Sequence, residues 1–486
     1  MDILTWDERS VLTERGFLPR PLGDYLDHGY GEVDTADRHR GMLLGLAIGD
    51  ALGKPIEGLT PSTIAERHGR VNRYLCSRHP ASLLPAGQVG ADTQLALLTA
   101  ACAATNGQFD PRDFAQRLQA WLPIARGAGD ANTAATLALR NGRPWTHSGQ
   151  HSAGSGAASR AAVVGLIHPD DMDMLRLSAT LATMQTHADQ TAVAASVATA
   201  ATVAHLSRLP TGEFDPSRLL DVITQALDGL EDPSVELVHV PARSNLRERL
   251  IVALDTVGKP LQAAYAALGT GDFVLEALPA AVWAFASAPD DMVKATIIAI
   301  NGGRASATVG SLVGAFAGAY NGAAGLPAPW LDHLEYVDGI AGHADALMDA
   351  TGAARRRQPL FVGNPLHPAS YAPFTLGGST MHTLEHAVRS AAASDPATSV
   401  KARLLPTPAD ARRFAALTQT RSDWNETASN TIRAILRRRF DGSDDASAQL
   451  LSAGLADFDA IDLLFKDDPF AMGSLLAGRQ AELAGH

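Results

Sequence analysis

Two stretches of this chain carry glycine at every fourth position, and this spacing constrains the fold more than any other feature of the sequence. One row is Gly41, Gly45 and Gly49, and the other is Gly310, Gly314 and Gly318. Residues four apart lie on one face of an α-helix. Each row therefore leaves a helix face without side chains, which lets another helix backbone approach closely. The rows predict tightly packed helices in a hydrophobic core.

Helical periodicity also dominates the rest of the chain. It predicts helices at Ala36–Leu52, Asp92–Thr105, Pro111–Leu122, Ala131–Arg140, Ser159–Ile167, Met172–Met184, Thr191–Leu206, Pro216–Leu227, Pro289–Ile300, Thr308–Tyr320 and Pro329–Asp349. The best strand pattern, Ser234–Pro241, is short. We therefore predict an all-α bundle of many helices around a central core.

Changes in composition divide the chain into four segments. Residues 1–35 form an N-terminal extension that contains Trp6, Phe17, Tyr25 and Tyr30, and residues 36–352 form the main domain. An arginine-rich break begins a predicted linker at 353–380, which is rich in glycine, proline, serine and histidine. Residues 381–486 read as a helical C-terminal region.

Composition and charge exclude several classes of protein. The formal net charge of −12 argues against a nucleic-acid or acidic-membrane binder, because such binding depends on clustered Lys and Arg. The two cysteines, Cys76 and Cys102, lack the spacing of a zinc site. The N-terminus has no basic and apolar signal-peptide pattern, and apolar runs are shorter than a bilayer requires. We therefore expect a cytoplasmic protein.

Two acidic residues follow the first glycine row. Asp50 lies near the end of the predicted helix, and Glu57 follows the Gly53-Lys54-Pro55 turn. A loop carboxylate beyond a buried helix end suits a general base or a ligand. The alternative for Asp50 is that it caps or braces a loop through backbone N–H groups.

Two further segments open helices. Asp92 and Thr93 begin one helix, and the segment Asn301–Thr308 bends at Gly302-Gly303 before another. Asp92 or Thr93 could serve simply as an N-cap. Clustered oxygens at two such helix starts are also suited to divalent cations.

A glycine-rich loop at Ser152–Arg160 leads into a helix. Bare N–H groups at a helix start favour an anion such as a diphosphate, although the same pattern occurs in ordinary turns. Downstream, His187 lies close to a helix start, where it could donate to a phosphate or a sugar hydroxyl, or could be purely structural.

Taken together, these segments resemble the ADP-ribosylglycohydrolase family, which includes dinitrogenase-reductase-activating glycohydrolases and the jellyfish J1 crystallins. The resemblance runs from about Asp37 to Gly325. It implies an all-α orthogonal bundle that holds two magnesium ions. It also implies hydrolysis of N- or O-glycosidic bonds that join ADP-ribose to arginine, serine or small acceptors.

Three of the family's motifs are well matched. Its Gly-Asp-x-x-Gly-x-x-x-Glu pattern falls on Gly49–Glu57, which would make Glu57 the catalytic or metal-bridging acid. Its glycine-rich ADP-ribose loop, usually Gly-Asn-Gly-Ala-Ala-Met-Arg, is similar to Gly154–Arg160, and its Thr-His pair matches Thr186 and His187. The resemblance thus implies that Gly154, Ser155, Gly156, Arg160 and His187 bind the ligand.

The two metal-binding motifs are degenerate. The family's Thr-Asp-Asp-Thr is here Gly90-Ala91-Asp92-Thr93, and its Gly-Gly-Asp-Thr-Asp-Thr aligns with Gly303–Thr308, where Ala305 and Ala307 replace the acids. Alanine offers no oxygen ligand. The residual metal-binding set is Glu57, Asp92, Thr93 and Thr308.

Two carboxylates cannot balance the charge of two magnesium ions, each of which prefers six oxygen ligands. We therefore expect no cofactor, with a single Mg²⁺ shared with substrate phosphates as the open alternative. Arg304 stands beside the lost ligands. We hypothesise that its guanidinium pairs with Glu57 or Asp92, or binds a diphosphate; the alternative is that it points to solvent.

These residues support two main readings of function. In the first, the protein binds ADP-ribose, an ADP-ribosylated protein or an ADP-ribosyltransferase, and two-metal hydrolysis is lost or strongly weakened. The N-terminal extension would then suit contact with a partner, by analogy with immunity proteins that resemble this family. In the second, Glu57 and Asp92 still hydrolyse a glycosidic bond with one metal or none. A redeployed structural protein is a third reading.

Overall fold

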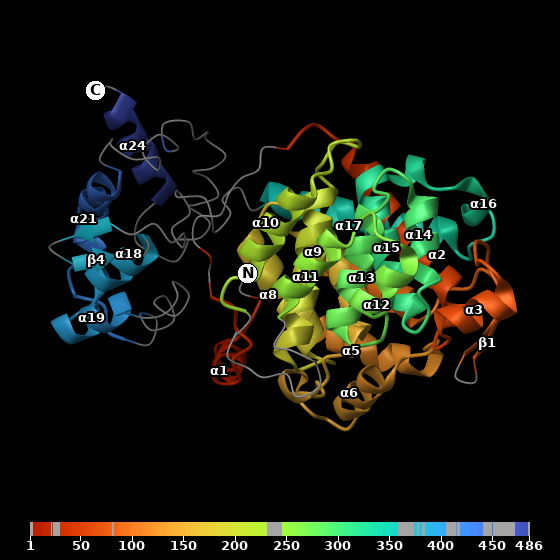
Figure 1. Ribbon diagram of the computed structural model, residues 1–486. Coiled ribbons are helices and arrows are strands. Elements are labelled where there is room, and N and C mark those ends of the chain that lie inside the picture. The colour runs from red at the N-terminus through yellow and green to blue at the C-terminus, as the bar shows by residue number, and fades with distance from the viewer. Residues whose placement is uncertain are drawn as a thin grey trace. The chain divides into compact units, whose positions relative to one another are not determined.

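The computed structural model describes residues 3–20, 22, 30–79, 82–230, 245–357, 374–376, 379–381, 384–404, 415, 418–440, 450 and 472–484. Two compact units make up the chain (Figure 1). The main unit spans Ile3–Gly352, and the C-terminal unit comprises Ala353–His486 together with Met1–Asp2.

The main unit is built almost wholly from helices. They are α1 (Trp6–Glu14), α2 (Thr35–Gly53), α3 (Pro61–His68), α4 (Ala91–Asn106), α5 (Pro111–Trp121), α6 (Asp130–Arg140), α7 (Ala158–Ile167), α8 (Met172–Met184), α9 (Gln190–Leu206), α10 (Pro216–Ala226), α11 (Leu246–Asp255), α12 (Leu261–Leu268), α13 (Val274–Ala286), α14 (Met292–Ile300), α15 (Ser306–Asn321), α16 (Ala328–Leu331) and α17 (Val337–Arg357). Short 3₁₀ turns lie at η1 (Lys54–Ile56), η2 (Leu122–Ile124), η3 (Trp145–His147), η4 (Ser155–Ala157) and η5 (Ala323–Gly325). The only strands described in this unit are β1 (Ser77–His79) and β2 (Ser82–Leu84), an antiparallel pair with Ser77 opposite Leu84. The predicted all-α fold is confirmed.

The C-terminal unit contains helices and one small hairpin in its described residues. Its helices are α18 (Leu384–Ala392), α19 (Pro396–Leu404), α21 (Trp424–Arg439) and α24 (Met472–Ala484), and the hairpin pairs β3 (Phe374–Leu376) with β4 (Ser379–Met381). Its own hydrophobic core includes Val388, Trp424, Ile432 and Leu476. The hairpin begins within the stretch that we predicted to be a linker.

Most predicted helices of the main unit are present with ends that differ by one or two residues, and the helix predicted at Pro289–Ile300 begins later, at Met292. The long helix predicted at Pro329–Asp349 is wrong: the chain forms α16, breaks, and resumes as α17. The break contains Tyr336 in a left-handed conformation (φ 58°), which a continuous right-handed helix cannot contain. The strand predicted at Ser234–Pro241 lies outside the described residues.

The two glycine rows meet each other along the antiparallel helices α2 and α15. A Cβ added at Gly41, Gly45 or Gly49 would lie less than 3.0 Å from the backbone oxygen of Gly318, Gly314 or Gly310, respectively. The same is true in the reverse direction from α15 to α2. No side chain larger than hydrogen fits this seam, so the backbones themselves are in contact.

The glycine seam extends to the C-terminal end of α2 and the N-terminal end of α15. A Cβ at Gly53 would clash with the backbone of Ser306, and the Ser306 hydroxyl donates to the Gly53 carbonyl oxygen over 2.8 Å. The C-terminal end of α2 and the N-terminal end of α15 are thereby held together. Residues 50–57 and 304–308 consequently lie side by side.

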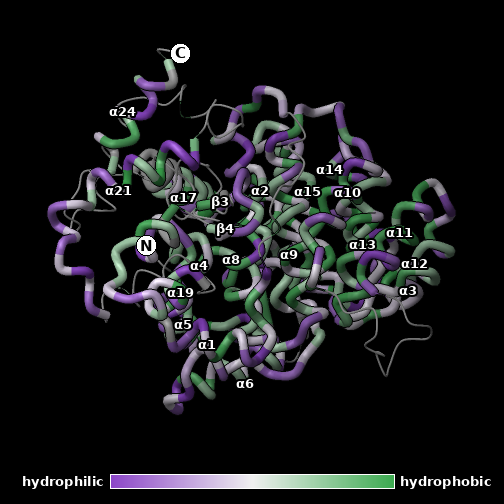
Figure 2. The backbone as a smooth tube through the Cα atoms, turned by 90° about the vertical axis from the view of Figure 1, so that its left-hand side faces the viewer, coloured by the Kyte–Doolittle hydropathy of each residue, from purple (hydrophilic) through white to green (hydrophobic). Residues whose placement is uncertain are grey.

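The core surrounds this helix pair. Helix α9 is buried from Ala192 to Leu206, and α13 is buried from Val274 to Ala286 except for Glu276. Hydrophobic stretches gather where the helices of the main unit pack together (Figure 2). Within the described ranges, none of the helices combines the length and apolar character that a bilayer-spanning helix needs.

The N-terminal segment packs against the main unit. Leu4, Leu12 and Phe17 are buried in the main hydrophobic core. Glu8 pairs with Arg112 of α5 and accepts a hydrogen bond of 2.9 Å from Trp145 Nε1. Residues 3–17 are therefore a structural part of this unit.

We predict that replacing Gly45 or Gly314 with alanine destabilises the protein. The added methyl group would meet backbone atoms that cannot move without separating α2 from α15, so the free energy of unfolding should fall by about 1–3 kcal/mol. Urea titration followed by circular dichroism measures this change. In the control variant Gly342→Ala, on α17, the added Cβ meets nothing within 4 Å, and stability should rise by about 0.5–1 kcal/mol. Equal effects at both positions would contradict the importance of the seam.

Candidate functional site

The carboxyl group of Asp50 braces the loop that opens α4. Its Oδ2 accepts hydrogen bonds from Gly90 N (2.8 Å), Thr93 N (3.1 Å) and Thr93 Oγ1 (2.6 Å). Asp50 is completely buried, and burial raises the pKa of its carboxyl despite these bonds. Asp50, which belongs to α2, thus accepts the hydrogen bonds of the N–H groups at the start of α4. The N-cap residue of α4 is Gly90, so neither Asp92 nor Thr93 occupies that position.

Asp92 lies where three helix ends meet. It is in the first turn of α4, and its Oδ2 accepts a hydrogen bond of 3.1 Å from Thr308 Oγ1 in the first turn of α15. The Ser159 hydroxyl of α7 lies near the carboxyl group but makes no hydrogen bond with the residues that the structure describes. Burial raises the pKa of Asp92 to about 7, and the charges of Asp50 and Glu57 add to the increase. The residue nevertheless keeps a partly exposed surface.

Glu57 is held by Lys54, a residue that the sequence analysis treated only as part of a turn. Lys54 Nζ lies 2.6 Å from Glu57 Oε2, and the lysine side chain is 7% exposed. Burial acts to lower the pKa of the Lys54 ammonium, but the charges of Glu57, Asp50 and Asp92 outweigh it and the pKa is raised. We define the acidic cluster as Asp50, Glu57 and Asp92; the buried Lys54 ammonium pairs with Glu57 and feels the charge of the other two acids.

The glycine-rich loop contacts His187. It forms the 3₁₀ turn η4 before α7, and the Ser155 N–H donates to the Asp272 carbonyl oxygen over 2.8 Å. A Cβ at Gly156 would lie 3.4 Å from the His187 ring and 3.3 Å from Asn132 Nδ2. Glycine at this position lets the loop backbone approach the imidazole closely.

Arg160 is a buried brace and does not face outward toward a ligand. The guanidinium donates to the carbonyl oxygens of Ala182 (3.0 Å) and Gly156 (3.1 Å), to Asn132 Oδ1 (3.3 Å) and to the Thr186 hydroxyl. Only 1% of its surface is exposed, and burial lowers its pKa to about 9. The predicted ligand contact of Arg160 thus becomes an indirect role, in which it fixes the loop and Thr186.

His187 is also buried and is held by its neighbour. Its Nδ1 lies 2.8 Å from Thr186 Oγ1, and burial lowers its pKa to about 3, helped by the charge of Arg160. The imidazole is therefore neutral at physiological pH. The other ring nitrogen, Nε2, is on the side of the ring nearest Gly154 and Gly156.

Arg304 does not form the predicted pair with Glu57 or Asp92. Its side chain is exposed and makes no ion pair among the described residues, and Lys54 occupies the predicted position instead. Its backbone bonds to the turn after Glu57: Arg304 N donates to Leu59 O, and Arg304 O accepts from Gly58 N, each over 2.7 Å. The residue is left-handed (φ 54°) and anchors the Glu57 loop through its main chain.

Three residues of this region escaped sequence reasoning. Lys54 was passed over because a lysine in a turn normally reaches solvent, and Asn132 because a lone asparagine in a helix carries no motif. Asp272 lies close enough to act electrostatically on Glu57 and Lys54, and burial raises its pKa. Only the fold brings these residues to the loop and the acidic cluster.

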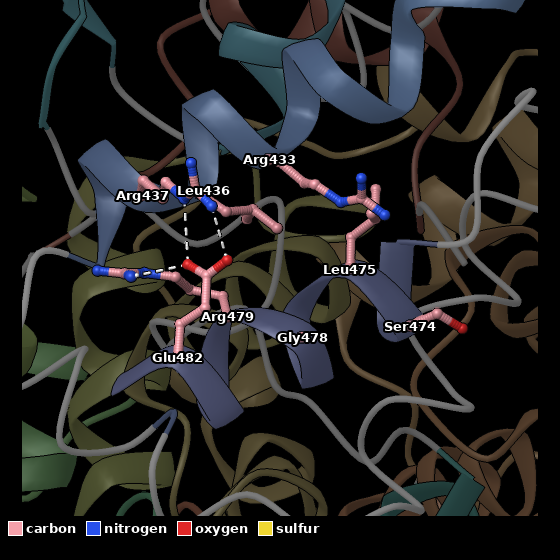
Figure 3. A pocket seen from close by; sticks show the side chains of 8 residues that line it. All are labelled: Arg433, Leu436, Arg437, Ser474, Leu475, Gly478, Arg479 and Glu482. Atoms are coloured by element: carbon pink, nitrogen blue, oxygen red, sulfur yellow. Dashed lines mark hydrogen bonds and ion pairs between the residues drawn. The ribbon is translucent and has the colours of Figure 1, made fainter. Parts of the chain in front are cut away.

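A separate pocket in the C-terminal unit lies between α21 and α24, where ion pairs join the two helices (Figure 3). Glu482 of α24 accepts hydrogen bonds from Arg437 Nη2 (2.8 Å) and from Arg479 Nη1 (3.1 Å). Arg479 also donates to the Phe440 carbonyl oxygen at the end of α21 over 2.9 Å. These charged groups are paired with one another and join the two helices.

Comparison with known proteins accounts for the geometry of the main unit. The ADP-ribosylglycohydrolase family profile matches residues 32–357. The chain belongs to the ADP-ribosylglycohydrolase family. A solved structure titled "ADP-ribosylglycohydrolase-related protein complex" is 27% identical, with a TM-score of 0.52 over 65% of this chain and 99% of the other.

Relatives within the family differ in what is known of them. An uncharacterized protein of Archaeoglobus fulgidus is 28% identical over 63% of this chain and 95% of its own length. The ADP-ribosylarginine hydrolase of Serratia proteamaculans is 25% identical over 65% and 80%. The ADP-ribosyl-[dinitrogen reductase] glycohydrolase of Rhodospirillum rubrum is 34% identical over 28% and 48%. The resemblance drawn from the motifs is thereby confirmed.

The residues present do not fit the two magnesium ions that the family implies. Ala91, Ala305 and Ala307 are buried at the helix starts where oxygen ligands would be needed. The residues that the structure describes contain no group of three or more His, Cys, Asp or Glu side chains arranged to hold a metal. Asp92, with Thr308 beside it, could give one carboxylate ligand to a magnesium ion that is also held by ligand phosphates.

We predict that His187 makes the stability of the protein depend on pH. The folded state keeps this imidazole neutral down to about pH 3, whereas the unfolded chain takes up the proton near pH 6.5. The unfolded state therefore binds more protons in this window, and stability falls as the pH is lowered. Replacing His187 with glutamine should remove roughly 2–3 kcal/mol of the decline in unfolding free energy between pH 7 and pH 4.5.

The measurement is a series of urea titrations of the wild-type and variant proteins across this pH range. Asp92 contributes with the opposite sign, since its pKa is raised, but it is present in both proteins and cancels in the comparison. His68→Gln, at an exposed position in α3, is the matched control and should leave the slope unchanged. Parallel slopes for the wild-type and His187→Gln proteins would show that the imidazole is not buried in its neutral form.

Proposed function

We propose that this protein binds ADP-ribose, free or attached to a protein, and that two-magnesium hydrolysis is lost or strongly weakened. The observation that carries the proposal is a contrast within one site. The ligand loop at Gly154–Gly156 keeps its close contact with His187, while alanines occupy the positions of three metal-binding acids. Binding elements are present where metal ligands are missing.

The loop offers chemistry suited to a diphosphate. It leads directly into α7, so the dipole of this helix favours negative charge at the loop. The glycines at 154 and 156 bring the backbone, rather than side chains, to the ligand. Neutral His187 can donate one hydrogen bond from Nε2 when Nδ1 accepts from Thr186.

The class of partner follows from the family. Relatives are named for ADP-ribosylarginine and ADP-ribosyl-[dinitrogen reductase] as substrates, which supports an ADP-ribosylated protein as the natural ligand. An ADP-ribosyltransferase, the enzyme that attaches ADP-ribose to proteins, is the second candidate partner. The N-terminal segment gives it little support, because Leu4, Leu12 and Phe17 are already buried in the protein's own core.

One observation favours a second candidate function, a residual hydrolase. Asp92 has a pKa of about 7 and a partly exposed surface, so at neutral pH it is divided between acid and base forms. A carboxyl group with such a pKa is suited to protonate a leaving group or to activate water. Glu57 is less free for this task, since Lys54 holds its carboxylate at 2.6 Å.

We predict that ADP-ribose binds with an affinity that does not depend on magnesium. Calorimetric titration should give the same dissociation constant in metal-free buffer with chelator and in buffer with magnesium. Gly156→Val should weaken binding by about tenfold or more, a loss of roughly 1.4 kcal/mol, because its side chain crowds His187 and Asn132 and displaces the loop. Gly342→Ala is the control and should bind like the wild type. Absence of any binding would refute the proposal.

Hydrolysis of ADP-ribosylated arginine and serine peptides separates the two candidate functions. The binding protein should release no ADP-ribose above the spontaneous rate, with or without magnesium. A residual hydrolase would turn over in the presence of chelator and lose its activity in Asp92→Asn, which removes the titratable carboxyl. Turnover abolished by chelator and by Glu57→Gln would instead identify a working metal-dependent enzyme and overturn the loss of metal.

A further inference from the structure

We propose that the ammonium group of Lys54 is the resident cation of the acidic cluster and supplies in this chain the positive charge that divalent metals bring to such a site. The inference rests on the proposed function, since it explains how the site keeps its shape without metals. It concerns a residue to which neither the motifs nor the comparisons assign a role.

The first support is the position of the ammonium. Lys54 is the residue that follows α2 and begins η1, and only 7% of its side chain is exposed. Its Nζ contacts Glu57 Oε2 at 2.6 Å, and the charges of Asp50 and Asp92 also act on it. A lysine in a turn would ordinarily extend into solvent. Here the amine turns inward and pairs with Glu57, within range of the charges of Asp50 and Asp92.

The second support is Gly90, which makes room for the lysine stem. A Cβ at this position would lie 2.8 Å from Asp50 Oδ1 and 3.2 Å from Lys54 Cδ. The family pattern has threonine here, followed by the acid that Ala91 replaces. Gly90 therefore leaves space for the aliphatic part of an inward-pointing lysine. Ala91 removes a carboxylate that would have been a metal ligand.

The third support is the unpaired oxygen of Asp50. Its Oδ2 has three donors, but the completely buried Oδ1 has no hydrogen-bond partner within the described part of the chain. A buried carboxylate oxygen without a donor is costly unless a positive charge lies nearby. Lys54 acts on Asp50 as that charge.

The arrangement leaves no place for a binuclear centre. Two divalent ions would add four positive charges beside an ammonium that cannot leave without breaking its pair with Glu57. Lys54 and the metals are thus alternatives for the same carboxylates. Removing the ammonium should convert the cluster from a site that repels a divalent ion into one that attracts it.

The test titrates full-length wild-type protein and Lys54→Met with Mn²⁺, following the loss of the free-ion electron paramagnetic resonance signal. Methionine keeps much of the apolar stem and removes the charge. Mn²⁺ should bind the variant about tenfold more tightly or better, because a like charge within a few ångströms of the site is gone. Mn²⁺ should also raise the thermal midpoint of the variant and leave that of the wild type unchanged.

Two controls make the result specific. Lys294→Met removes a charge from an exposed position on α14 and should behave like the wild type. Lys54→Arg keeps the charge and should also remain insensitive to Mn²⁺. Equal, weak binding by Lys54→Met and wild-type proteins would overturn the proposal.

The wild-type titration decides the matter even if Lys54→Met does not fold. Micromolar Mn²⁺ binding by the wild type would show that the ammonium yields to a metal and would overturn the inference, whereas weak binding supports it. ADP-ribose titration in metal-free buffer is the separate test of the proposed function. Failure of ADP-ribose binding with the expected Mn²⁺ result would refute that function and leave the role of Lys54 intact.

Discussion

The direct contact between the backbones of α2 and α15 is the constraint on which the rest of this structure depends. Seven glycines along the two helices, the last of them Gly53 at the end of α2, leave no room for a side chain between them. Close backbone packing of this kind excludes any larger side chain along the seam. The pairing places residues 50–57 next to residues 304–308, so that Thr308 reaches Asp92 and the backbone of Arg304 holds the turn after Glu57.

One internal cation offsets part of the negative charge of the acidic cluster. Three carboxylates face one ammonium and two threonine hydroxyls, and burial raises the pKa of Asp50 and Asp92 so that protonation can relieve part of the remaining negative charge. A family member with metal ions would need ionised acids at Ala91, Ala305 and Ala307. In this chain an apolar surface replaces them, and a lysine holds the glutamate that would otherwise be the catalytic or metal-bridging acid.

In the glycine-rich loop, the fold brings together residues that lie in separate motifs of the sequence. The Gly154–Arg160 segment and the Thr186-His187 pair do come together, as the resemblance implied. The guanidinium of Arg160, however, donates its hydrogen bonds to carbonyl oxygens and to Thr186, because the donors of a buried arginine need partners within the protein. Similarly, Arg304 was expected to enter the site, but its left-handed backbone directs the chain so that its main chain holds the Glu57 loop.

Sequence alone determined the helical class, the ends of most helices in the main unit and the family, because these depend on local periodicity and on short motifs. It also determined that three acids are absent, since the side chain of alanine carries no oxygen in any fold. Which side chains lie near the positions of the three missing acids was decided only by the tertiary structure. Lys54 turns inward and Arg304 outward because the α2–α15 seam and the space at Gly90 set the direction of each side chain. The glycine rows are visible in the sequence, but the direction of a single side chain such as Lys54 or Arg304 depends on neighbours that only the fold brings together.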